Sequence, residues 1–190
     1  KHPEHHIFEH TPESLGAWCA GHGMPAYRGA QILEWVYQKG VADPGAMSNL
    51  SKADRDLLAG EMTFLSGRTV AEQAASDGTR KLLIEWDEPA AGAGAAGGPL
   101  PIAGATGPRT ECVMIPSDGR RTACLSSQVG CPVGCRFCAS GVGGLESNLS
   151  AGRIVEQVWR LRYGLGGGSD AGREDAASGE GEEREERIEK

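Results

Sequence analysis

The sequence predicts an α/β protein, in which a helical N-terminal accessory domain is followed by the start of a partial (βα) barrel. Three observations support this fold class. Apolar residues recur at helical spacing through residues 25–62, and two strand–turn–strand patterns occupy residues 69–128. An amphipathic helix then follows a cysteine-rich loop near residue 150.

The first domain, residues 1–68, is predicted to contain two or three short helices. The stretch "PAYRGAQILEWVYQKG" has apolar residues on one helical face: Ile32, Leu33, Trp35 and Val36. Gly40 is a typical helix end, and Ser51 followed by Asp54 resembles a capping box at the start of the next helix.

Residues 69–123 are predicted to form a β-hairpin region. The stretch "TVAEQAASDGTRKLLIEW" indicates a strand, an Asp-Gly turn and a second strand, and "TECVMIPSDGRRTACLSSQ" repeats the pattern. Residues 88–108 lie between them as a Gly/Ala/Pro tract, which we expect to be a flexible surface insertion because it offers little to a core.

Residues 124–165 are predicted to begin the barrel as one strand, a cysteine loop and one helix. Ser150 is a candidate N-cap of that helix. Its apolar stripe consists of Ile154, Val155, Val158, Trp159 and Leu161. We expect this single βα unit to leave a parallel strand edge and the apolar stripe without partners, so that the chain beyond the helical domain is marginally folded.

Charge is distributed unevenly over the 190 residues, whose formal net charge is −7. Residues 170–190 hold nine acids and four bases, whereas residues 109–162 hold seven arginines and four acids. Residues 166–190 are therefore interpreted as a disordered acidic low-complexity linker at which the chain is truncated. The chain has no apolar run that could span a membrane and no signal peptide, so we expect a cytoplasmic protein without a membrane partner.

Three of the six cysteines stand in "CPVGCRFC", residues 131–138, at the spacing C-x3-C-x2-C. A disulfide would use two of them, and a tetrahedral zinc site needs four ligands. Three thiolates can instead bind three irons of a [4Fe-4S] cluster and leave the fourth iron open to a small molecule. A zinc site completed by Cys124 or a histidine, and a redox pair of Cys135 with Cys138, are the alternatives.

Other residues of this loop suit a cluster. Gly130 and Gly134 let the backbone curl closely, and Pro132 limits its freedom. Phe137 stands between the last two cysteines, where its ring can shield one side of a cluster from water.

Three segments in order resemble one family. The run "ACLSSQVGCPVGCRFCASGVGGLESNLSAGRIVEQVW", the N-terminal "RGAQILEWVYQKGVADPGAMSNLSK" and the strand "ECVMIP" are similar to the RlmN/Cfr family of radical S-adenosylmethionine (SAM) adenine methyltransferases. The resemblance implies a radical SAM partial (βα) barrel. It also implies methylation of adenine carbon 2 in 23S rRNA, with tRNA as a second candidate substrate, by means of a [4Fe-4S] cluster, SAM and a methyl-cysteine intermediate.

Two other functions stay open. One is the Cfr-like methylation of adenine carbon 8. The other, from a different class, is a non-catalytic iron–sulfur or zinc binding module.

The resemblance also assigns roles by position. The cluster ligands it implies are Cys131, Cys135 and Cys138. Cys124 matches the cysteine that resolves the protein–RNA crosslink, Glu111 matches the proton acceptor, and Phe137 falls in the cofactor-binding loop. Cys19 and Cys112 match nothing catalytic and are interpreted as structural thiols. An electron donor such as flavodoxin and a disulfide bond are further expectations attached to the resemblance.

The departures from the family are specific. The Gly-Glu-Pro motif that binds SAM and the C-terminal cysteine that carries the methyl group do not occur in these 190 residues. Arg153 stands where relatives usually have Glu, which removes an acid from the start of a helix. We therefore expect the chain to be the N-terminal part of a longer enzyme and not to methylate RNA by itself.

Overall fold

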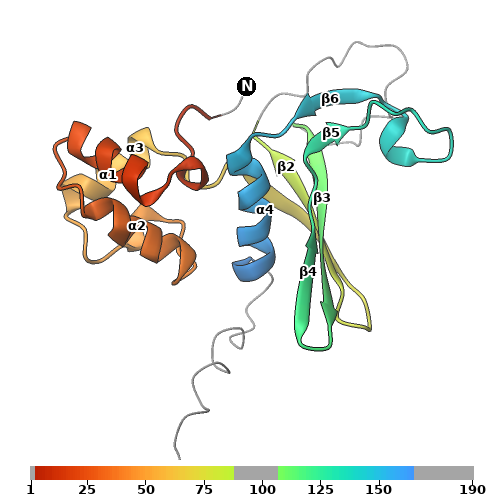
Figure 1. Ribbon diagram of the computed structural model, residues 1–190, viewed down its shortest axis with the longest axis horizontal. Coiled ribbons are helices and arrows are strands. Elements are labelled where there is room, and N and C mark those ends of the chain that lie inside the picture. The colour runs from red at the N-terminus through yellow and green to blue at the C-terminus, as the bar shows by residue number, and fades with distance from the viewer. Residues whose placement is uncertain (1–2, 88–106, 165–190) are drawn as a thin grey trace, which may run out of the picture.

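The computed structural model describes residues 3–87 and 107–164 of the chain. Helices come first, as the apolar spacing predicts (Figure 1). They are η1 (Ile7–Glu9), α1 (Pro12–Gly21), α2 (Arg28–Tyr37), η2 (Pro44–Ala46) and α3 (Lys52–Glu61). Ser51 caps α3 by accepting a hydrogen bond from the Asp54 backbone N–H, which confirms the Ser51 half of the predicted capping box. α2 ends three residues before the predicted end at Gly40, which instead adopts a φ of 66° in the following turn.

The two predicted hairpins are confirmed as one antiparallel sheet. Its strands are β1 (Gly67–Ala74), β2 (Arg80–Trp86), β3 (Arg109–Ser117) and β4 (Arg120–Cys124), in the order β1-β2-β3-β4. β2 therefore pairs directly with β3, although residues 88–108 separate them in the sequence. Most of that segment lies outside the described residues, as do residues 166–190, so the predictions made for both stay predictions.

The cysteine loop lies between two short strands. β5 (Gln128–Gly130) leads into it, the one-turn helix η3 (Ala139–Gly141) lies within it, and β6 (Leu145–Asn148) leads out of it to α4 (Ala151–Tyr163). β5 and β6 pair antiparallel, so the predicted strand–loop–helix unit contains a returning strand that the sequence did not reveal. The named strands of the described ranges all pair antiparallel, so the parallel neighbours expected for the first barrel strand are not among them.

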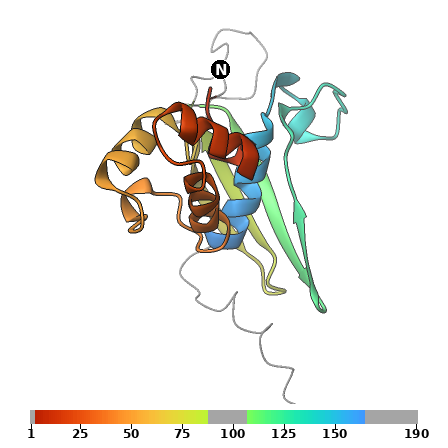
Figure 2. The ribbon, with the colours of Figure 1, turned by 60° about the vertical axis from the view of Figure 1, so that its left-hand side comes forward.

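α4 lies between the helical region and the sheet (Figures 1 and 2). Trp159 of α4 packs against the helical core cluster and donates its indole N–H to the Val36 carbonyl at 2.9 Å. Leu161 and Ile154 pack against the sheet cluster built on Leu82 and Ile84. The expectation that the apolar face of this helix would lack partners is therefore wrong for most of the face, because Ile154, Val155, Trp159 and Leu161 pack against two different cores. Val158 of the same face is 43% exposed.

The α/β class with an N-terminal helical region is thus confirmed. Among the described residues, no helix has the length and apolar character required to cross a lipid bilayer.

Candidate functional site

The cysteine loop has a narrow neck. The Cys131 backbone N–H donates to the Gly144 carbonyl at 2.9 Å, which closes residues 131–144 into one loop. Gly130 at the neck has a φ of 76°, and a Cβ on it would lie 2.0 Å from the Gly144 oxygen. Only glycine fits there, so the predicted importance of Gly130 has a concrete cause. In Figure 1 the loop projects beyond the end of the sheet.

The six cysteines divide into two groups by burial. Cys19 and Cys112 are fully buried, and burial raises the pKa of Cys112 to about 11, which fits the structural role expected of them. The other four are at least partly exposed, namely Cys124, Cys131, Cys135 and Cys138. All six are free thiols, so the expected disulfide is not formed in this structure.

The three loop thiols fit an iron–sulfur cluster by their chemistry. They are accessible soft donors, and the Cys138 N–H to Cys135 carbonyl bond of 3.1 Å places two of them in one turn. Their sulfurs are not gathered, because within residues 3–87 and 107–164 no group of three or more His, Cys, Asp or Glu side chains is placed to hold a metal ion. The loop therefore offers the donors without a preformed cage.

Apolar side chains of the same loop face outward. Phe137 is 93 % exposed, and Val133 and Val142 are exposed as well. The Phe137 ring is thus free to cover a group held by the loop, but its predicted shielding role stays a prediction.

Glu111 and Cys124 lie on one face of the sheet. Val113 pairs with Cys124 across the β3–β4 ladder, and Glu111 is two residues before Val113 on β3, so all three side chains leave the sheet on the same side. Cys112, between them on β3, belongs instead to the core cluster on the α4 side. The two residues to which the resemblance gives catalytic roles are therefore neighbours on the face opposite α4.

The segment that joins Cys124 to the cysteine loop is held by α4. The fully buried Gln157 accepts from the Ser126 N–H at 2.9 Å and donates to the Ser126 carbonyl at 2.8 Å. Ser126 in turn donates its hydroxyl to the Glu111 carbonyl at 2.7 Å. One helix thus fixes the backbone at β3 and at the entrance to the loop.

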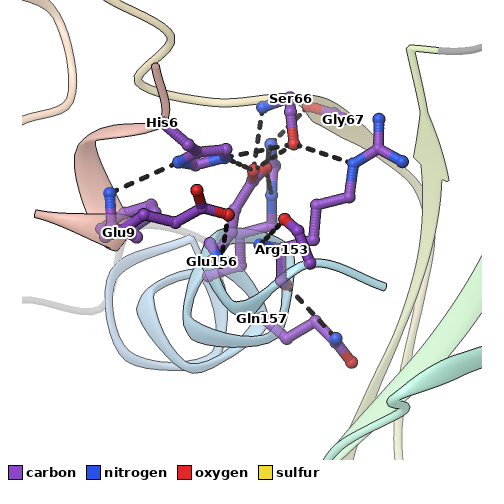
Figure 3. Close-up of polar contacts among 11 residues, drawn as sticks. His6, Glu9, Ser66, Gly67, Arg153, Glu156 and Gln157 are labelled. Carbon is purple, nitrogen blue, oxygen red and sulfur yellow. Dashed lines mark hydrogen bonds and ion pairs between the residues drawn. The ribbon is translucent and has the colours of Figure 1, made fainter. Parts of the chain in front are cut away.

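A buried polar cluster joins the helical region to α4 (Figure 3). The carboxylate oxygen Oε2 of Glu156 lies 3.1 Å from His6 Nε2 and accepts from the Ser66 N–H at 2.8 Å. Its other oxygen accepts from Arg160. Because the Phe8 N–H donates to His6 Nδ1, the proton of the ring lies on Nε2 and is directed at Glu156 and Ser66.

The groups around Glu156 favour the ionised form of its carboxyl. Burial raises its pKa, but the hydrogen bond from His6, the Arg160 charge and the Ser66 N–H together hold the pKa below its ordinary value. The neighbouring Arg153 is also buried, with its guanidinium 5.2 Å from the centre of the Trp86 ring.

Sequence reasoning missed this cluster. Arg153 was interpreted only as the loss of an acid from a helix start, whereas the structure uses it as a buried residue. Polar residues do recur at helical spacing at Arg153, Glu156, Gln157 and Arg160, but this pattern is equally typical of a helix face in contact with water.

The chain is similar to known proteins along most of its length. Residues 6–63 match the family described as the ribosomal RNA large subunit methyltransferase N-terminal domain. The chain is 34% identical over 153 residues to the dual-specificity RNA methyltransferase RlmN of Dichelobacter nodosus, which covers 80% of this chain. It is 38% identical over 150 residues to the probable dual-specificity RNA methyltransferase RlmN of Desulfitobacterium hafniense, which covers 76% of this chain. The chain spans 37% of the length of each of these curated relatives.

A solved structure is similar as well. The crystal structure of a radical SAM methyltransferase from Sphaerobacter thermophilus superposes with a TM-score of 0.69 at 33% sequence identity. The match covers 83% of this chain and 41% of that one.

Proposed function

The chain belongs to the RlmN family and corresponds to the N-terminal part of its members, and on that premise we propose that it takes part in radical SAM methylation of RNA. One observation carries the proposal most directly. Three accessible thiols lie on one closed loop, which β6 connects to α4. The chain that carries this loop is similar to a radical SAM methyltransferase over 83% of its own residues.

The loop cysteines are the proposed holders of the metal centre. Cys131, Cys135 and Cys138 would bind three irons of a [4Fe-4S] cluster, and SAM would occupy the position left open. Bound there, the cluster and SAM supply the radical chemistry that a carbon atom as unreactive as adenine carbon 2 requires. Phe137, exposed on the same loop, would limit the access of water.

The sheet face that carries Glu111 and Cys124 is proposed to complete the reaction. The exposed thiol of Cys124 would resolve the bond between protein and RNA, for which an accessible thiolate is required. The Glu111 carboxylate would accept the proton that leaves carbon 2. Their position on one sheet face supports this pairing, because both must reach the same base.

The proposed substrate is adenine in 23S rRNA, methylated at carbon 2. The relatives are named as dual-specificity RNA methyltransferases, which supports a second RNA substrate, and tRNA is the candidate. An electron donor such as flavodoxin is a further proposed partner.

The test uses the complete open reading frame that contains this chain, purified and reconstituted without oxygen. We expect about four irons and four sulfides for each chain, and 2-methyladenine in unmodified 23S rRNA by mass spectrometry after addition of SAM and a reductant. One zinc with no iron would instead support a binding module, and 8-methyladenine would support the activity at carbon 8. The zinc result would overturn the proposal, and 8-methyladenine would overturn its assignment of carbon 2.

A further inference from the structure

The charged side chain of Lys81 lies on the same sheet face as Glu111 and Cys124. We propose that Lys81 is a positioning residue, which holds the Glu111 carboxylate in place for removal of the proton from the substrate base. This inference rests on the proposed function, from which Glu111 takes its role as proton acceptor.

The contact is direct. Lys81 Nζ lies 3.1 Å from Glu111 Oε1. Lys81 pairs with Val113 across the β2–β3 ladder, and Val113 pairs with Cys124 across β3–β4, so these three side chains form one row across the sheet. The ammonium of Lys81 therefore lies on the face that Glu111 and Cys124 occupy.

The main chain of Glu111 is already fixed by other groups. Its carbonyl accepts the Ser126 hydroxyl at 2.7 Å, and the buried Gln157 accepts from the Ser126 N–H and donates to the Ser126 carbonyl. The remaining freedom of Glu111 is in its side-chain torsions. An ion pair from a neighbouring strand restricts that freedom, because both strands belong to one hydrogen-bonded ladder.

The ion pair is compatible with proton transfer. Lys81 contacts Oε1, so Oε2 can accept the proton without breaking the contact. In that step the bond between carbon 2 and hydrogen breaks, the proton forms a bond to Oε2, and the electron pair stays in the adenine ring. Lys81 itself gains and loses nothing, which distinguishes a positioning residue from the proton acceptor.

Folding should depend little on this pair. The side chain of Lys81 is 36% exposed and that of Glu111 is 55% exposed, and ion pairs of such exposure contribute little to stability. Variants of Lys81 should therefore fold, bind iron and bind RNA as the parent protein does.

The chain provides a matched control. Arg80, the preceding residue of β2, forms an ion pair with Glu72 of β1. It pairs across the sheet with Met114, which packs against the core on the α4 side, so Arg80 lies on the opposite face. Arg80→Met removes an ion pair of β2 without touching the face of Glu111.

The experiment measures methylation of a 23S rRNA fragment by the complete reading frame, with either hydrogen or deuterium at carbon 2 of the target adenine. Proton transfer to a positioned base accelerates a reaction by a factor of about 10²–10⁴. Lys81→Met should lose part of this acceleration, so kcat should fall about tenfold, with little change in KM for RNA. The deuterium isotope effect on kcat should rise, because proton removal becomes slower than the other steps. Lys81→Arg should restore most of kcat, and Arg80→Met should match the parent.

The outcomes separate the inference from the proposed function. An unchanged kcat and isotope effect in Lys81→Met, with methylation intact in the parent, would overturn the inference alone. A loss expressed in KM rather than kcat would make Lys81 an RNA contact and would also overturn it. Absence of methylation in the parent would overturn the proposed function, and the inference with it.

Discussion

The loop cysteines are more accessible to solvent than the two buried thiols, Cys19 and Cys112. Accessibility decides which thiols can react, and the accessible ones on the loop are Cys131, Cys135 and Cys138. The loop thiols are partly exposed, whereas Cys19 and Cys112 are fully buried and carry raised pKa values, chiefly because of burial. The sequence distinguished them by spacing, and the structure distinguishes them by solvent contact.

The first prediction concerns these thiols. After anaerobic reconstitution, Cys131→Ala, Cys135→Ala and Cys138→Ala should each reduce bound iron and sulfide to background, because three ligands hold three irons. Cys19→Ala should keep both at the parent level. Full iron content in Cys135→Ala would contradict the assignment of the loop.

The second prediction concerns Cys124. Within the complete reading frame, Cys124→Ala should form a covalent protein–RNA species that is not released, visible as a shifted band on a denaturing gel. The melting temperature should change little, because Cys124 is exposed at the end of β4. Normal turnover by this variant would return Cys124 to the structural thiols.

At the scale of elements, the β5–β6 hairpin determines the shape of the cysteine loop. Its neck depends on Gly130, where positive φ and the nearby Gly144 oxygen both exclude a side chain. Gly134 also has a positive φ, of 67°, but no atom lies within 4 Å of the position of its Cβ. Comparing substitutions at the two glycines therefore separates the effect of a steric clash at the neck from the effect of backbone strain.

The third prediction follows from that comparison. Gly130→Ala combines strain of about 1–3 kcal/mol with a clash that must open the neck, so iron uptake should fall strongly. Gly134→Ala has the strain without the clash and should keep more of the iron. Iron content and absorption after reconstitution measure both. Equal losses in the two variants would show that the neck contact is unimportant.

At the scale of the whole molecule, α4 is the common partner of both cores. Its apolar side chains contact the helical region and the sheet, and Glu156 joins it to His6 and Ser66 in the space between. The Glu9 carboxylate also accepts from the Gly152 N–H at 3.1 Å, near the start of α4. The helical region is therefore docked on the helix that follows the cysteine loop.

The fourth prediction tests this docking by pH. The pKa of Glu156 is lowered in the folded state, so its contribution to the free energy of unfolding is complete above its unfolded pKa and is lost as pH falls through the folded pKa. Unfolding by denaturant, measured between pH 7 and pH 3, should show that the free energy of unfolding of the unsubstituted protein falls with pH. Glu156→Gln should be less stable by about 3 kcal/mol at pH 7, because His6 and Arg160 lose a buried anionic partner, and should show a smaller loss.

The carboxylate of Asp87 interacts with that of Glu156 and affects the same measurement. The pKa of Asp87 is raised by burial and by Glu156, so the contribution of Asp87 to the free energy of unfolding grows as pH falls and opposes the loss caused by Glu156.

The control for Glu156→Gln is a surface carboxylate. Glu34 pairs with Lys39 at 3.2 Å on the surface, and Glu34→Gln should cost less than about 1 kcal/mol. A pH dependence in Glu156→Gln equal to that of the parent would contradict the role given to this carboxylate.

The sequence by itself determined the features that depend on neighbouring residues. Ser51 and Ser150 cap the helices that they precede, the two Asp-Gly turns make hairpins, and the cysteine spacing places three thiols on one loop. These features are local, because turn and cap geometry depend on a few adjacent residues. The family resemblance rests on the same short segments.

Only the tertiary structure decided which distant residues meet. His6, Ser66 and Glu156 are brought together across up to 150 positions of sequence, and Lys81 meets Glu111 across 30. Local pattern could not predict these contacts, since the polar face of α4 resembles a solvated face until the helical region covers it. The two cores that α4 contacts and the shared sheet face of Glu111 and Cys124 have the same origin, because packing of elements is set by the whole chain.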